Sequence, residues 1–386
     1  MPTTPLKNAL YRAALPFLSP GPGRHPSLIV SGSPLVDKRG YLNLLRRHHV
    51  LGAAAILSAP GRRTLLLSST DQPRHIARED TLFRVASITK MATALAALRC
   101  VEEKRLGLDE PVQSCLPPAC ASPALEGVTL RHLLSHTSGL QDPPDLEARL
   151  IRSESVPEVL QVAANGSPGQ SFRYSNLGFG LIGCILESVL QKNISAAMKE
   201  IVFDPLSLEA YMDPSPLDRD RIMPISRILP YRPGQDLQVT PLGERPLSEP
   251  DPLRHFGHTA GSMYITAPSL EKLLRCLMRD GAPLLSPSLG KEMKKVQASY
   301  GSLSPTLSYG LGLLLIQDPG LSSSRILGHQ GFAYGCANGA FWEEETGRMV
   351  IFLNGGCSEA RSGRLGLCNR DLLYWAFRKE MPSWSK

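Results

Sequence analysis

The spacing of hydrophobic positions predicts a helix and then a hairpin near the start of the chain. Residues 37–49 place apolar side chains on one helical stripe. Two short apolar runs, 50–57 and 64–69, follow and are separated by the turn at Pro60 and Gly61. This arrangement is typical of two antiparallel strands joined by a tight connection.

The next segment, 83–99, reads FRVASITKMATALAALR. From Thr89 to Leu98 it is dense in Ala, Leu, Met and Thr and contains no Gly or Pro. Residues of these types favour a helix, and the shortage of polar side chains indicates burial. We therefore predict a largely buried helix with Ser87 as its first residue.

The middle of the chain is predicted to be mostly helical, and the last third returns to strands. Helical patterns lie at 127–140, at 177–190 (amphipathic) and at 267–278. Thr129 and Gly139 are the predicted caps of the first, and Pro268 and Ser269 cap the third. Strand-like runs lie at 310–316, 325–327, 337–342 and 349–354, before a closing helix at 369–378.

Two segments are predicted to be irregular. Residues 1–36, rich in Pro and Gly, are expected to form an irregular or partly helical arm. Residues 213–251 are expected to form a long surface excursion near the mouth of a cleft. The arm lacks the continuous apolar region of a secretory signal, and no apolar run can span a bilayer. The expected location is therefore the cytoplasm, with no membrane partner.

Composition and charge are those of an ordinary globular protein. The chain has 386 residues, 42% of them hydrophobic and 20% charged, with a net charge of +7. The dense basic clusters, 46–49 and 62–63, fit solvated faces better than a nucleic-acid site, and no nucleic-acid motif accompanies them. We expect no nucleic-acid partner.

Metal chemistry is not predicted either. The eight cysteines include no C-x-x-C pair, which fits reduced, buried thiols, although Cys115 and Cys120 could bridge in an oxidising compartment. His132 and His136 have metal-ligand spacing, but with no Glu after His132 and no third ligand they are interpreted as packing histidines. No metal and no organic cofactor is expected.

Ser87 and Lys90 are the first candidate catalytic pair. Residues three apart share a helix face, with Cβ atoms roughly 5–6 Å apart, so these two side chains can touch. A buried lysine whose pKa is lowered by desolvation can take the proton of a serine nucleophile. The helix N-terminus adds partial positive charge where an oxyanion would form. Standing alone, S-x-x-K also occurs by chance in many helices.

Two later motifs add candidates. In Tyr174-Ser175-Asn176, a tyrosine beside a lysine can share its proton; the structural alternative is a core tyrosine with an asparagine turn. In His329-Gln330-Gly331, the glycine lets a substrate approach a strand edge and the histidine offers a donor or a cation. Here the alternative is a turn before a strand.

The three motifs in this order resemble the class C β-lactamase-like serine hydrolases. That group includes D-alanyl-D-alanine carboxypeptidases, D-aminopeptidases, family VIII carboxylesterases and some acyltransferases. The similarity covers roughly Tyr41 to the C-terminus and includes FRVASITK, LGLDEPV, TLRHLLSHTSGL, PGQSFRYSNLGFGLIG, AGSMYITAPSLEKLL, YGLGL, GHQGFAYG and VIFLNG.

The resemblance implies an α/β serine β-lactamase or penicillin-binding-protein-like fold, an antiparallel sheet flanked by helices plus a mostly helical lobe. After the arm at 1–36, the β-lactamase-like domain would span 37–386. Its α/β lobe would comprise 37–101 and 253–386, and its helical lobe 102–252. The active site would lie between the lobes.

The same resemblance implies the catalytic roles. Ser87 would be the nucleophile and Lys90 its base or proton shuttle. Tyr174 would help to activate Ser87 and protonate the leaving group. The acyl-enzyme would then pass its acyl group to water or to another nucleophile.

Substrate-binding roles are implied for four more residues. Asn176 would bind the substrate amide or acyl carbonyl, and His329 and Gly331 would line the strand-edge side. The backbone N–H groups of Ser87 and Phe332 would form the oxyanion hole.

One departure from the family pattern affects the expected substrate. β-Lactamases of this type carry Lys-Thr-Gly where this chain has His329-Gln330-Gly331. A mostly neutral histidine and a longer glutamine weaken recognition of a β-lactam carboxylate. We therefore expect an esterase or D-amino-acid peptidase acting on a small ester or amide. An acyltransferase with the same acyl-enzyme and a true β-lactamase are the alternatives, and the oligomeric state cannot be predicted.

Overall fold

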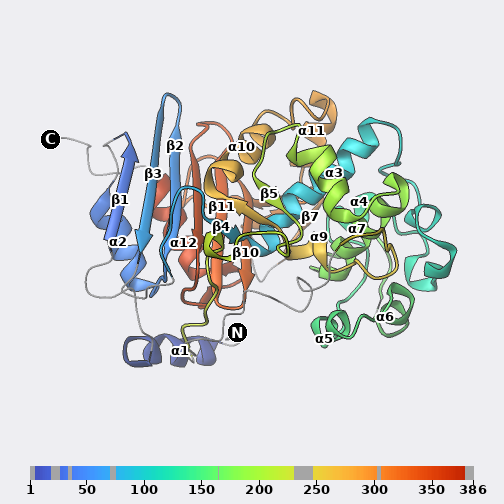
Figure 1. Cartoon of the computed structure of the whole chain (residues 1–386), viewed down its shortest axis with the longest axis horizontal. Helices are drawn as coiled ribbons and strands as arrows, with labels where there is room; N and C mark the ends of the chain where they lie inside the picture. The colour runs from blue at the N-terminus through green and yellow to red at the C-terminus, as the bar shows by residue number, and fades with distance from the viewer. Residues whose placement is uncertain are drawn as a thin grey trace.

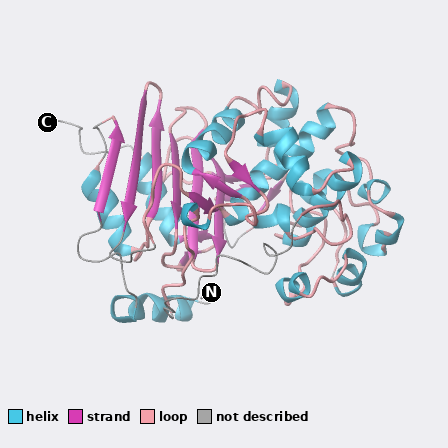
Figure 2. Ribbon diagram, viewed as in Figure 1, coloured by secondary structure: helices cyan, strands magenta, loops and turns pink. Residues whose placement is uncertain are grey.

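The computed structural model describes residues 5–18, 27–33, 37–69, 75–163, 165–229, 247–301 and 306–378. A large antiparallel sheet occupies one side of the molecule and a cluster of helices occupies the other (Figures 1 and 2). The predicted strands at both ends of the chain come together in this one sheet.

The sheet has nine strands in the order β1-β3-β2-β12-β11-β10-β9-β8-β7. The predicted hairpin forms its N-terminal part as β2 (Ala53–Ala59) and β3 (Arg62–Ser69). Six more strands come from the last third of the chain, namely β7 (Ala298–Ser299), β8 (Leu307–Tyr309), β9 (Leu314–Ile316), β10 (Ile326–Ala333), β11 (Cys336–Glu343) and β12 (Met349–Asn354). Strand β12 pairs with β2 and so joins the two ends of the chain.

The N-terminal segment contributes more regular structure than the expected irregular or partly helical arm. Helix α1 (Pro5–Leu18) lies across one end of the strands in Figure 1, and β1 (Ser27–Gly32) pairs with β3 at the sheet edge. Sheet pairing was not predicted for residues 1–36, because Ser and Gly at both ends of this run hide its strand pattern. The division into lobes at 101 and 253 stays a prediction.

Helices cover both faces of the sheet. On one face lie α2 (Lys38–Arg47) and α12 (Leu367–Phe377), which pack against each other and on β11 and β12. On the other lies α10 (Ala267–Met278), against β2, β11 and β12. All three helices fall within a residue or two of the predicted ones. The N-cap of α10 is Thr266, whose Oγ1 accepts from the Ser269 N–H, and not the predicted Pro268 and Ser269.

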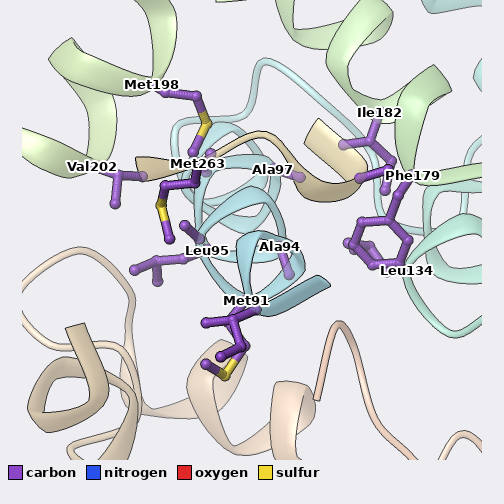
Figure 3. Close-up of a cluster of buried hydrophobic side chains, with 14 of the residues drawn as sticks. Met91, Ala94, Leu95, Ala97, Leu134, Phe179, Ile182, Met198, Val202 and Met263 are labelled. Atoms are coloured by element: carbon purple, nitrogen blue, oxygen red, sulfur yellow. The ribbon is translucent and has the colours of Figure 1, made fainter. Parts of the chain in front are cut away.

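The helical part is built around α3 (Thr89–Glu102), which follows the 3₁₀ turn η1 (Ala86–Ile88). Side chains of α3, including Met91 and Leu95, pack among apolar residues of neighbouring helices (Figure 3). The surrounding helical elements are α4 (Leu130–Leu134), α5 (Leu146–Ile151), α6 (Val156–Val162), α7 (Asn176–Leu190), α8 (Ile194–Met198), η5 (Lys199–Phe203), α9 (His258–Gly261) and α11 (Pro287–Lys294). Short 3₁₀ turns lie at η2 (Val112–Cys115), η3 (Pro118–Cys120), η4 (Pro123–Leu125) and η6 (Arg219–Arg221).

Small sheets complete the fold. Strands β4 (Leu82–Arg84), β6 (Tyr264–Thr266) and β5 (Ala210–Tyr211) pair in that order and lead the chain into η1. The hairpin of β13 (Arg361–Ser362) and β14 (Leu365–Gly366) precedes α12.

Two predicted helices differ in detail from the structure. Helix α4 begins after Thr129 as predicted, but it ends at Leu134 and not at Gly139. Gly139 has φ +80 beyond the helix, where a Cβ atom would lie 2.1 Å from the carbonyl oxygen of Gly166. Helix α7 is buried around nearly its whole circumference, so its expected amphipathic pattern is wrong.

All eight cysteines are free, including Cys115 and Cys120, for which a bridge in an oxidising compartment was considered.

Among the described residues, no single helix is long and apolar enough to cross a bilayer, while α7 and the 194–203 segment pass that test only as a pair bent by 84°. Most of the excursion predicted over 213–251 lies outside the described residues, from 230 to 246.

A buried carboxylate ties the end of β11 to its surroundings. Glu343 is fully buried and accepts from Ser322, Thr346 and Arg348 at 2.5–2.7 Å. We expect Glu343→Ala to lower the free energy of unfolding by about 3 kcal/mol, because it leaves the partners of a buried charge unpaired. Glu344→Ala, which removes an exposed pair with Arg325, is the control and should cost under about 1 kcal/mol. Equal urea midpoints for the two variants would contradict this role.

Candidate active site

Ser87 lies in the 3₁₀ turn η1, between strand β4 and helix α3, so the prediction that it is the first residue of the helix is wrong: α3 begins at Thr89. The preceding residue, Ala86, has φ +50, an unusual conformation for a residue with a side chain. Its carbonyl accepts a 2.6 Å hydrogen bond from Thr89 Oγ1, which stabilises the turn. The turn leaves the Ser87 side chain half-buried on a cavity wall. Residues in such rare backbone conformations are often found at functional sites.

Lys90, one helical turn after Ser87, is fully buried. Its Nζ lies 3.2 Å from Ser87 Oγ, 2.8 Å from Asn176 Oδ1 and 2.7 Å from the Ala260 carbonyl oxygen. Burial lowers the pKa of Lys90 to about 7, against an opposing contribution from the negative charge of Asp142. A substantial fraction of Lys90 is therefore neutral at physiological pH.

The partners of Lys90 define what its neutral form can do. A neutral amine has two N–H groups and one lone pair, whereas a carbonyl oxygen can only accept. The Asn176 and Ala260 oxygens therefore take both N–H groups. The lone pair is left for the Ser87 hydroxyl, which is the geometry of a base beside a nucleophile.

Tyr174 lies beside this pair. Lys90 Nζ is 4.9 Å from the centroid of its ring. Burial raises the pKa of Tyr174, although a hydrogen bond with Ser87 acts in the opposite direction. The phenol thus stays protonated and is suited to donate a proton rather than to remove one.

His136, predicted to be a packing histidine, packs beneath the tyrosine. Its ring centroid is 4.2 Å from that of Tyr174, and its Nδ1 accepts from the Ser175 N–H at 3.1 Å. Burial and the charge of Lys90 lower the pKa of His136 well below its usual value. It therefore acts as a neutral support for the segment that carries Tyr174.

Asn176 begins α7 and faces Lys90. Because its Oδ1 accepts from Lys90, its Nδ2 amide is the donor that it can offer to a substrate carbonyl. Asp142 holds this helix start: its carboxylate accepts from Ser175 Oγ at 2.7 Å and from the N–H groups of Asn176 and Leu177 at 2.8 and 3.0 Å. Asp142 was not predicted, because nothing in the sequence links it to a helix start more than thirty residues later.

His329 lies on β10 across the cavity, but it is not a cation. Burial and the charge of Lys90 lower its pKa to about 3. Its Nδ1 lies 2.5 Å from the Gln330 carbonyl oxygen, so Nδ1 carries the proton and Nε2 accepts from Tyr309 Oη at 2.8 Å. Both ring nitrogens are thus occupied by protein groups, and the expected donor or cation is absent at this position.

Gly331 and Gln330 each make a close contact that explains the residue type at that position. A Cβ atom at Gly331 would lie 2.1 Å from the Val85 carbonyl oxygen, so glycine permits β10 to approach η1. The Gln330 amide donates to the Arg364 carbonyl at 2.7 Å and accepts from the Gly366 N–H at 3.0 Å. Gln330 therefore holds the β13–β14 hairpin against the site.

These elements enclose a cavity of about 650 Å³. Predicted site residues on its wall are Ser87, Tyr174, Asn176, His329 and Phe332, while Lys90 and Gly331 lie behind it. The cavity is also lined by Gln330 of the third motif and by residues that were not predicted as site residues: Gln141, Asp142, Phe172, Arg173, Tyr300, Leu314, Arg361 and Arg364. Three arginines and one carboxylate thus give this wall a positive balance.

The described residues contain no group of three His, Cys, Asp or Glu side chains placed to hold an ion. His132 Nδ1 accepts from the Thr129 N–H in the cap of α4, as a packing histidine would. The reacting groups near Ser87 are an amine, a phenol and an amide.

Comparison with known proteins places the chain in a family. Residues 37–363 match the family model described as Beta-lactamase. The chain belongs to the β-lactamase family. Esterase EstB from Burkholderia gladioli is 29% identical over 374 residues, covering 86% of this chain and 92% of EstB. Monacolin J acid methylbutanoyltransferase from Aspergillus terreus is 45% identical over 151 residues, covering 31% of this chain and 37% of that enzyme.

Solved structures show the same fold. D-amino acid amidase from Ochrobactrum anthropi SV3 has a TM-score of 0.70 at 24% identity, covering 88% of this chain and 95% of that one. EstCE1, described as a hydrolase with promiscuous acyltransferase activity, has a TM-score of 0.69 at 22% identity and covers 87% and 97%.

These matches confirm the predicted family and the predicted α/β fold class. As a member of this family, the protein is a β-lactamase-related serine hydrolase of ester or amide bonds.

Proposed function

We propose that the protein cleaves a small ester or amide through an acyl-enzyme on Ser87. The observation that carries this proposal is the bonding of Lys90, whose two N–H groups have carbonyl acceptors and whose lone pair is left for Ser87. In this mechanism neutral Lys90 takes the hydroxyl proton as Ser87 Oγ attacks the substrate carbonyl.

The remaining groups would complete the reaction. The carbonyl oxygen becomes an oxyanion that the N–H groups of Ser87 and Phe332 stabilise, and Asn176 orients the acyl part. Tyr174 gives its proton to the leaving alcohol or amine and is reprotonated through Lys90. Water then attacks the acyl-enzyme with the same groups acting in reverse. In this mechanism the reaction of the small-molecule substrate uses no cofactor. The cytoplasmic location stays a prediction.

Rapid mixing with a p-nitrophenyl ester tests the mechanism. An acyl-enzyme that forms faster than it hydrolyses gives a burst of p-nitrophenol equal to the enzyme concentration. The amplitude of the burst should rise in proportion to the concentration of the wild-type enzyme. The Ser87→Ala variant should give no burst. A linear time course whose rate is unchanged in that variant would refute the proposal.

The wall of the cavity favours substrates with a negative group. Arg361 lies over the Phe332 ring, with its guanidinium carbon 4.7 Å from the centroid, and Arg364 lies beyond it on the same hairpin. Arginine is well suited to bind carboxylates. Neutral His329 stands where β-lactamases of this family carry the lysine of Lys-Thr-Gly. The positive charge on the wall therefore comes from Arg361 and Arg364 of the β13–β14 hairpin, which Gln330 holds in place.

We expect Arg364→Ala to raise KM for an ester with a terminal carboxylate about tenfold, because one charge-assisted hydrogen bond contributes roughly 1.5–3 kcal/mol. KM for the uncharged ester of equal length should change less than about twofold. The control is Arg279→Ala, which is not on the cavity wall. Equal effects of Arg364→Ala on both esters would show that Arg364 does not recognise charge.

Acyl transfer is a second candidate function, supported by the similarity to the methylbutanoyltransferase over 151 residues. Hydrolysis and transfer use the same acyl-enzyme and differ only in the group that attacks it. A transferase would lose its acyl group faster as candidate alcohols or amines are added. If the lifetime of the acyl-enzyme does not change when alcohols or amines are added, the enzyme is a hydrolase.

A β-lactamase activity is expected to be weaker than esterase activity. His329 is neutral and both its nitrogens are occupied, so β10 offers no cation where the family's β-lactamases carry a lysine, and the positive charge of Arg361 and Arg364 lies on the β13–β14 hairpin instead. We expect kcat/KM for a short-chain p-nitrophenyl ester to exceed that for a chromogenic cephalosporin by at least about tenfold. The reverse ranking would support the β-lactamase alternative.

A further inference from the structure

Helix α1 forms hydrogen bonds with the segment that leads into the β13–β14 hairpin. Asn8 Nδ2 donates to the Arg361 carbonyl at 2.8 Å, and Asn8 Oδ1 accepts from the Arg361 N–H at 3.3 Å. Tyr11 Oη accepts from the Glu359 N–H at 3.1 Å. Because residues three apart share a helix face, α1 presents both side chains to the same stretch of chain. The family match starts at residue 37, so these bonds come from a part of the chain that the family model does not cover.

The β13–β14 hairpin is too short to hold its own position. Its strands pair over only two residues each, 361–362 with 365–366. A two-stranded hairpin alone is marginally stable at best in water, so contacts with the rest of the protein must fix it. Gln330 of β10 supplies one set through the backbone of Arg364 and Gly366. Helix α1 supplies the other set, at β13.

This hairpin carries two arginines of the cavity wall. Arg361 and Arg364 both line the cavity, and the Arg361 guanidinium lies over the ring of Phe332. Asn8 bonds both backbone groups of Arg361 itself, so the position of this side chain depends on α1. Asn8 and Tyr11 are not on the cavity wall, and they therefore act on a substrate only through the hairpin.

Apolar packing anchors the other half of α1. Leu15 is buried against Leu51 and Ile228, and Tyr11 packs at the edge of this cluster. Burial raises the pKa of Tyr11, so its phenol stays neutral while its oxygen accepts the Glu359 N–H. The apolar cluster thus fixes the helix to the protein body, and the polar side chains before it reach the hairpin.

We propose that Asn8 and Tyr11 are positioning residues that hold Arg361 and Arg364 in place to recognise an anionic group on the substrate. This inference rests on the proposed function, in which these arginines bind the negative group. If α1 only stabilised the fold, its loss of contact would affect charged and uncharged substrates equally. A role in positioning affects the charged substrate selectively.

Kinetics with two esters of equal length, one with a terminal carboxylate and one uncharged, test this selectivity. We expect Asn8→Ala to raise KM for the charged ester about fivefold, part of the effect of losing a charge-assisted hydrogen bond. KM for the uncharged ester and both kcat values should change less than about twofold. In a variant that already carries Arg361→Ala and Arg364→Ala, adding Asn8→Ala should change KM for the charged ester less than about twofold, because the two sites are coupled.

Asn193→Ala is the matched control. Asn193 makes the same two kinds of bond at the start of α8, with Nδ2 donating to the Ser248 carbonyl at 3.1 Å and Oδ1 accepting from the Ala196 N–H at 2.9 Å. This variant should leave both KM values unchanged. An equal rise of KM for both esters in Asn8→Ala, or the same charge-selective rise in Asn193→Ala, would overturn the proposal.

Hydrogen–deuterium exchange of the full chain tests the contact without turnover. Exchange in peptides covering 357–366 should be at least about fivefold faster in Asn8→Ala and in Tyr11→Phe, while peptides of α10 should exchange as in the wild-type protein. Unchanged exchange at 357–366 in both variants would overturn the proposal. Labelling of Ser87 by a fluorophosphonate reports the proposed chemistry separately and should be the same in Asn8→Ala, so the two failures are distinguishable.

Discussion

Ser87→Ala is expected to lower the rate of ester hydrolysis by about 10⁴-fold or more, because the reaction loses its nucleophile while the rest of the site remains. The Ser87 side chain lies on the cavity wall and bears little of the core packing, so the variant should fold normally. Substrate binding, measured as the dissociation constant for an unreactive analogue, should change less than about threefold.

Ser114→Ala is the matched control. Ser114 is exposed, and the partners of its hydroxyl, the Pro111 carbonyl and Cys115 Sγ, lie within its own turn. This variant should keep the wild-type rate. A Ser87→Ala enzyme with more than a tenth of the wild-type rate would place the nucleophile elsewhere.

Lys90→Ala is expected to lower the acylation rate by at least roughly 10²-fold, the scale of a general base contribution. The substitution also leaves Asn176 Oδ1 and the Ala260 carbonyl without their donor, so a stability measurement should accompany the kinetics. Lys272→Ala, which removes an exposed ammonium bonded to the Ser207 carbonyl, serves as the control and should have no effect on the rate.

The pH dependence separates a base from a purely structural lysine. Neutral Lys90 is the active form, so acylation by the wild-type enzyme should rise with pH through a midpoint near 7 and then level off. The pKa of His329, at about 3, is too low to account for this titration, and that of Tyr174 is raised. In Lys90→Ala the rise near pH 7 should be lost; its persistence would assign the titration to another group.

Much of the fold could be predicted from local patterns. The apolar runs that became β2 and β3, and the Gly-free and Pro-free run that became α3, needed no knowledge of distant residues. The predictions failed where contacts between distant segments determine the local backbone conformation. Gly139 looked like a helix cap, but its conformation serves the approach of the Gly166 backbone.

The site was predicted unevenly for a similar reason. Ser87 and Lys90 are three residues apart, so their spacing indicates a contact even though Ser87 lies in the 3₁₀ turn that precedes α3. Asp142 and Arg364 reach the cavity only through the packing of separate segments, and neither belongs to a pattern. The hydrogen bonds that occupy His329 depend on Tyr309, on another strand, so its charge state required the structure.

The position of a covalent adduct identifies the nucleophile of the protein. Wild-type protein and Ser87→Ala are each treated with a fluorophosphonate probe, digested, and examined by tandem mass spectrometry. We expect a single adduct on Ser87 in the wild-type protein and none in the variant. An adduct on a different residue, or equal labelling of both proteins, would contradict it.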